Sequence, residues 1–94
     1  MFVLHVDMKV ERDSRSALER CYAERFRPAI SRQEGFCGVE LLRPQEDEGN
    51  YRLSIAFEGR ELQRKWVSTE LHEEVWSALK GHCTEYSATG YSSV

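Results

Sequence analysis

The chain has 94 residues, of which 40% are hydrophobic, and a formal net charge of −3 at pH 7. These values are typical of one small globular domain spanning 1–94, and the mild acidity argues against nucleic acid or an anionic membrane as a partner. The N-terminus has neither a basic segment nor a long apolar run, which argues against a signal peptide and a membrane span. Cys21, Cys37 and Cys83 form no C-x-x-C pair, so we expect reduced thiols, a cytoplasmic location and no structural metal.

Apolar and polar side chains alternate from residue 2 to residue 10, which predicts a strand with one fully apolar face. His5 and Asp7 fall on the opposite, polar face of this strand.

Residues 12–35 follow with apolar positions at helical spacing. Pro28 has no N–H to donate to the carbonyl of Glu24, so a kink is expected there. Gly35 is a natural end for this helix.

A β-hairpin is predicted next, with strands at 36–44 and 51–58 joined by the polar turn 45–50. Cys37 falls on the apolar face of the first of these strands, and we expect it to be a small buried hydrophobe.

The last elements are predicted helices at 59–67 and 68–81 and a final strand within 82–94. The resulting order is β-α-β-β-α-β, a ferredoxin-like α+β fold whose antiparallel sheet carries helices on one face. The other face needs cover if it is at all apolar, and two sheets packed face to face would supply it. A homodimer is therefore expected.

The stretch WVSTELH contains Trp66 and His72, six residues apart. On one unbroken helix they would point roughly 120° apart and would not share a face. Ser68 and Thr69 lie between them, and both are favourable N-cap residues. If one helix ends and another begins here, both side chains can line the same pocket.

Each candidate has two interpretations. His72 is either a core histidine or a proton donor and acceptor, because imidazole titrates near neutral pH. Trp66 and Trp76 are either core anchors or a flat wall for an aromatic ligand. His5 and Asp7 either hydrogen-bond a ligand or form a polar sheet surface, and two ligands do not make a metal site.

Three stretches together resemble the antibiotic biosynthesis monooxygenase family: FRPAISRQEGFCGVELLRP, YRLSIAFE and LQRKWVSTELHEEVW. The resemblance covers essentially the whole chain. It implies a dimeric α+β barrel formed by two packed sheets, with a ligand pocket between sheet and helices in each subunit. Several members of the family oxidise polycyclic anthrones or hydroquinones with molecular oxygen, without a metal or flavin cofactor.

The resemblance also assigns roles to particular residues. Trp66 would form the aromatic slot and His72 would be the acid or base, so these two are the candidate catalytic residues. The candidate substrate-binding residues are Trp76, Phe26, Asp7 and His5.

Other relatives degrade heme, using an asparagine on the first strand, the tryptophan, and a heme-ligating histidine nine or ten residues after it. The matching places hold Asp7, Trp66, and Val75 or Trp76, which argues against heme degradation. We therefore predict a cofactor-independent monooxygenase for a small aromatic or quinol-like compound. The alternatives are a non-catalytic dimeric binding domain and a small-molecule isomerase for a hydrophobic ligand.

Overall fold

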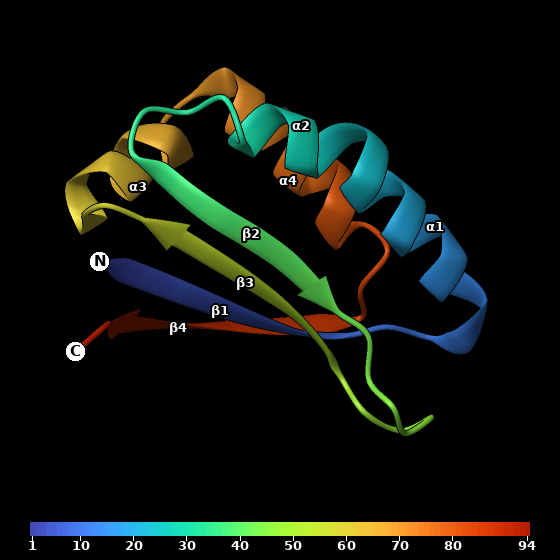
Figure 1. Cartoon of the computed structure of the whole chain (residues 1–94). Coiled ribbons are helices and arrows are strands. Elements are labelled where there is room, and N and C mark those ends of the chain that lie inside the picture. The colour runs from blue at the N-terminus through green and yellow to red at the C-terminus, as the bar shows by residue number, and fades with distance from the viewer.

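The computed structural model describes residues 1–94, and its element order confirms the predicted ferredoxin-like α+β arrangement (Figure 1). The elements are β1 (Phe2–Lys9), α1 (Arg15–Cys21), α2 (Arg27–Ile30), β2 (Phe36–Leu42), β3 (Tyr51–Phe57), α3 (Arg60–Val67), α4 (Glu70–Lys80) and β4 (Glu85–Ser92). All neighbouring strands are antiparallel, in the order β2-β3-β1-β4. None of the helices has the length and apolarity needed to span a bilayer.

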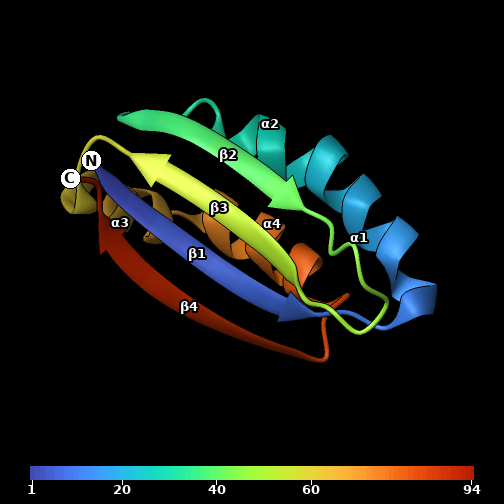
Figure 2. The same cartoon turned by 60° about the horizontal axis from the view of Figure 1, so that its bottom comes forward.

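The helices all lie on one face of the sheet, and the other face is uncovered in this chain (Figures 1 and 2). The pairing of β1 with β3 places Val6 opposite Leu53, and these two buried side chains belong to the covered face. The next pair along the ladder, Asp7 and Arg52, faces the other way. The predicted alternation of β1 therefore divides the sheet into an apolar and a polar side.

The segment before β2 is one long helical run whose middle is widened. A short 3₁₀ turn (Arg12–Ser14) leads into α1, and a π-helical turn (Tyr22–Phe26) separates α1 from α2. The N–H of Arg27 donates to the carbonyl of Tyr22, five residues back. The prediction from Pro28 was a kink; the irregularity that the structure has is this π-helical turn, which ends two residues before the proline that cannot donate the regular hydrogen bond.

Gly35 connects the helical run to β2 with a positive φ of 79°. Its carbonyl accepts a 2.8 Å hydrogen bond from the N–H of Glu58. A Cβ at this position would lie 2.4 Å from Cδ1 of Leu62 on α3. Glycine is required here both by the backbone conformation and by the close approach of α3.

The expectation that Cys37 is buried was wrong. The register between β2 and β3 shifts between Phe36 and Gly38, and Cys37 lies at this irregularity with an exposed side chain. A β-bulge adds a residue to one strand and redirects its side chain, which simple alternation cannot anticipate.

A polar cluster fixes the end of the β2–β3 hairpin against α1. The Glu19 carboxylate accepts hydrogen bonds of 2.8 and 2.6 Å from Arg43 and one of 2.5 Å from the hydroxyl of buried Tyr51. These bonds lower the pKa of Glu19 from 4.5 to about 2, with Arg43 the largest cause.

Candidate functional site

An apolar cavity of about 170 Å³ lies between the covered face of the sheet and the helices. Its sheet wall is formed by β1, β3 and β4, and its helical wall by α3, α4 and the π-helical turn. The lining residues are Leu4, Val6, Phe26, Leu53, Ile55, Gln63, Trp66, Val67, His72, Trp76, Tyr86 and Ala88.

The break between two helices that was predicted within WVSTELH is present, and it brings Trp66 and His72 together. α3 ends at Val67, and Thr69 is the N-cap of α4, its hydroxyl accepting a 3.1 Å hydrogen bond from the N–H of His72. The two ring centroids are 5.1 Å apart with their planes perpendicular. Both rings line the cavity, although Trp66 itself is only 2% exposed.

His72 is partly buried, and burial lowers the pKa of its imidazole below the ordinary value of 6.5. The neighbouring carboxylate of Glu73 opposes this shift but is the weaker influence. The imidazole of His72 makes no hydrogen bond with another protein group. At neutral pH the imidazole of His72 is therefore neutral. One of its ring nitrogens can donate a hydrogen bond to a ligand, and the other can accept a hydrogen bond or a proton.

Two further predicted residues complete the aromatic lining. Phe26 meets Trp66 edge to face at 6.4 Å between ring centroids, and the π-helical turn places it there. Trp76 meets Tyr86 of β4 in a perpendicular contact at 5.2 Å. Tyr86 is 50% exposed, so this second pair forms the rim of the cavity rather than its floor.

Gln63 and Tyr86 line the cavity but were not among the sequence candidates. Gln63 precedes Trp66 by three residues on α3, which puts the two side chains on neighbouring positions of one helix face. That spacing could have identified Gln63. Tyr86 could not be found in the same way, because its position depends on the pairing of β4 with β1 opposite Met8.

His5 and Asp7 do not line this cavity, since both lie on the uncovered face of the sheet. The Asp7 carboxylate accepts a 2.8 Å hydrogen bond from Nε of Arg52, and this contact lowers the pKa of Asp7. The His5 ring lies 5.2 Å from the ring of Tyr91. The structure thus separates these two candidates from Trp66, His72, Trp76 and Phe26, and their contact with a ligand stays a prediction.

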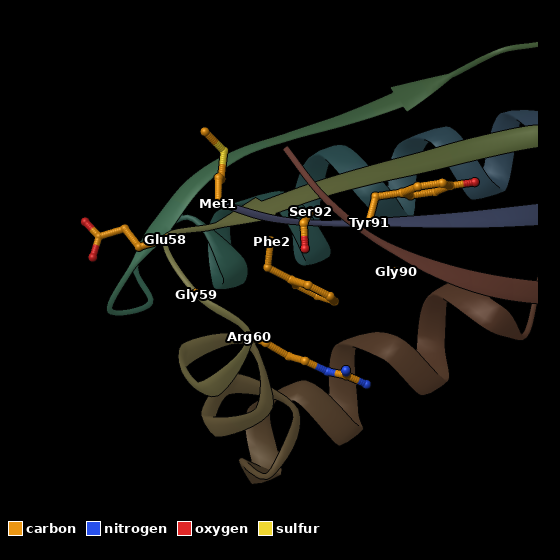
Figure 3. A pocket seen from close by; sticks show the side chains of 8 residues that line it. All are labelled: Met1, Phe2, Glu58, Gly59, Arg60, Gly90, Tyr91 and Ser92. Atoms are coloured by element: carbon orange, nitrogen blue, oxygen red, sulfur yellow. The ribbon is translucent and has the colours of Figure 1, made fainter. Parts of the chain in front are cut away.

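A second hollow of about 430 Å³ opens at the end of the sheet where the two termini lie (Figure 3). There the guanidinium of Arg60 lies 5.8 Å from the ring centroid of Phe2, while Glu58 points away from both. This hollow contains none of the predicted residues and has an open, mostly polar lining. No three His, Cys, Asp or Glu side chains converge anywhere in the chain in a group suited to a metal ion.

The fold and cavity define a ferredoxin-like α+β protein with an aromatic, partly enclosed site. The model of the antibiotic biosynthesis monooxygenase family matches residues 1–76, and the chain belongs to this family. The remaining residues complete α4 and supply the edge strand β4. A search of curated protein sequences found no match.

Solved structures share this fold at low sequence identity. SnoaB, a cofactor-independent oxygenase from Streptomyces nogalater, is 18% identical with a TM-score of 0.84, covering 98% of this chain and 92% of its own. A candidate antibiotic biosynthesis monooxygenase from Nitrosomonas europaea is also 18% identical, with a TM-score of 0.84 and coverage of 100% and 99%. A variant of MhuD with two manganese protoporphyrin IX molecules bound per active site is 22% identical, with a TM-score of 0.78 and coverage of 100% and 95%.

A porphyrin does not fit the site of this chain as it stands. The cavity of about 170 Å³ is smaller than the roughly 300–1,000 Å³ typical of pockets for drug-sized ligands. Val75 and Trp76, at the places where the heme-ligating histidine is expected, carry no ligating atom suited to iron.

Proposed function

We propose that this protein is a cofactor-independent monooxygenase that oxidises a small aromatic or quinol-like compound in the cavity between Trp66 and His72. The observation that carries the proposal is the perpendicular contact of these two rings at 5.1 Å inside an otherwise apolar cavity. Membership of the family and the likeness to SnoaB, which is named a cofactor-independent oxygenase, support it.

The residues present suit a substrate that supplies its own electrons. Neutral His72 accepts the proton of a substrate hydroxyl, leaving an electron-rich phenolate. The phenolate transfers electrons to molecular oxygen. For a dihydroxybenzene, one oxygen atom enters the ring and the other leaves as water, giving a hydroxyquinone. The apolar walls exclude water, so the proton acceptor and the polar group of Gln63 act in a medium of low dielectric.

The uncovered face of the sheet supports a homodimer as part of the same proposal. Leu42 is 46% exposed and Tyr91 is 49% exposed, and they share this face with the Asp7–Arg52 ion pair. A face that combines apolar area with fixed polar partners suits a second copy of the same sheet. We expect a dimer by light scattering at micromolar concentration, and a monomer would contradict this part of the proposal.

Oxygen uptake against a panel of phenols, hydroquinones and anthrones tests the catalytic proposal. His72→Ala is expected to lower turnover by about 100-fold, the size typical of losing a general base. Leu71→Ala is the matched control, because Leu71 precedes His72 on α4 but is 41% exposed and does not line the cavity. Wild-type turnover in His72→Ala would remove this residue from the mechanism.

The pH dependence of turnover adds an independent check. A proton acceptor must be neutral, so activity should fall as pH falls through the pKa of His72. Because burial lowers that pKa, the acid limb should lie below pH 6.5. An acid limb above pH 6.5 would contradict the assignment of His72 as the base.

A non-catalytic binding domain is the second candidate function, favoured by the enclosed cavity alone. It predicts saturable quenching of tryptophan fluorescence by a ligand without oxygen uptake.

A further inference from the structure

The cavity is small enough to limit the number of rings that a ligand can have. Its volume is about 170 Å³. An engineered protein cavity of about 150 Å³ takes one benzene molecule, and the difference is less than the roughly 30 Å³ that one water occupies in the liquid. One aromatic ring with small substituents therefore fits, and three fused rings require the walls to move.

The walls most able to move lie at the rim. Leu53 of the sheet wall is fully buried, and Phe26 and Trp66 are 1% and 2% exposed. Close-packed side chains of this kind give way only at a free-energy cost. The half-exposed Tyr86 and the partly exposed Trp76 are the parts of the lining that can be displaced outward.

The polar atoms of the inner lining are confined to one side. Gln63 on α3 and His72 on α4 provide an amide and an imidazole, and neither side chain makes a hydrogen bond within the protein. The opposite wall, from the sheet, consists of Leu4, Val6, Leu53, Ile55 and Ala88, and the one polar side chain that the sheet contributes, Tyr86, lies at the half-exposed rim. A hydroxyl placed toward the helices can find a partner, whereas one placed against the aliphatic wall loses its hydrogen bonds to water without replacement.

We infer that the ligand of this cavity is a single-ring aromatic compound with its hydroxyl groups adjacent on one edge, that is, a catechol. Gln63 and His72 hold the two hydroxyls, and the unsubstituted edge of the ring rests on the aliphatic wall. The inference rests on the proposed function only in taking this cavity as the ligand site.

Calorimetric titration without oxygen tests the inference apart from catalysis, because no turnover occurs. The probes are catechol, its isomer hydroquinone, and the three-ring compound anthrone. Catechol and hydroquinone have the same atoms and nearly the same volume, so they differ in the placement of one hydroxyl. Catechol is expected to bind about tenfold more tightly than either of the other two. Hydroquinone would leave one buried hydroxyl without a hydrogen-bond partner, and anthrone would force the packed walls of the cavity apart.

Variants test the assigned partners. Gln63→Leu is expected to abolish most of the preference for catechol over hydroquinone. Arg64→Leu, at the next position of α3 and outside the cavity lining, should leave it unchanged. Trp76→Leu should widen the rim and raise the affinity for anthrone.

Equal affinity for hydroquinone would overturn the one-edge arrangement, and equal affinity for anthrone would overturn the single-ring limit. No measurable heat with catechol at millimolar concentration would overturn both. If catechol binds with the stated preference but oxygen uptake is absent, the inference stands and the monooxygenase proposal fails.

Discussion

The two faces of the sheet are built from the same strands but differ in what stabilises them. On the covered face, Val6 and Leu53 are buried by apolar packing, and burial also shifts the pKa of His72 above them. On the uncovered face, Asp7 and Arg52 form an ion pair in contact with water, and that pair shifts the pKa of Asp7. Neighbouring residues of one strand should therefore differ strongly in their contribution to stability.

The largest difference is expected between Leu53 and Ser54, which are adjacent on β3. Leu53→Ala should lower the free energy of unfolding by about 2–5 kcal/mol, because it removes a fully buried side chain and leaves a void. Ser54→Ala, on the uncovered face, should change it by less than about 0.5 kcal/mol. Urea unfolding measures both, and similar values would contradict the assignment of the two faces.

A smaller difference is expected between two glycines near the start of β2. Gly35→Ala should cost about 1–3 kcal/mol, because alanine is strained at φ 79° and its Cβ would meet Leu62. Gly38 has open space around its added Cβ, so Gly38→Ala should leave stability unchanged or raise it by up to about 1 kcal/mol. Thermal unfolding followed by circular dichroism compares them, and equal losses would contradict the close approach of α3.

The smallest effect is expected from Arg52→Ala on the uncovered face. Arg52 is 46% exposed in its pair with Asp7, and pairs in contact with water contribute little to stability. The loss should shrink as salt is raised, because ions screen an exposed pair. A loss that is large and independent of salt would show that this pair is buried, for example by a partner subunit.

Much of the fold could be predicted because its signals are local. The alternation in β1, the hairpin of β2 and β3, and the helix break at Thr69 all depend on residues a few positions apart. The juxtaposition of Trp66 and His72 followed from that break.

The rest of the site depends on contacts between distant segments. Tyr86 reaches the rim through its pairing opposite Met8 across β1 and β4, and no local pattern encodes that register. Cys37 is exposed by an irregularity between β2 and β3. His5 and Asp7 were recognised as sharing one face, but which face the helices cover decides that they lie away from the cavity.

The π-helical turn at Tyr22–Phe26 has a consequence for how this site can vary between relatives. A π-helical turn uses about one residue more than an α-helical turn for the same rotation, so removing one residue would restore a regular helix and leave the segment beyond it on its present face. Leu18 and Cys21, which precede the turn, would keep their packing, and the change would be confined to the residues of the turn itself, among them Phe26 of the cavity lining. A single-codon insertion or deletion in this helix can thus exchange one wall of the cavity, so ligand preference can diverge within the family without any substitution among the remaining lining residues.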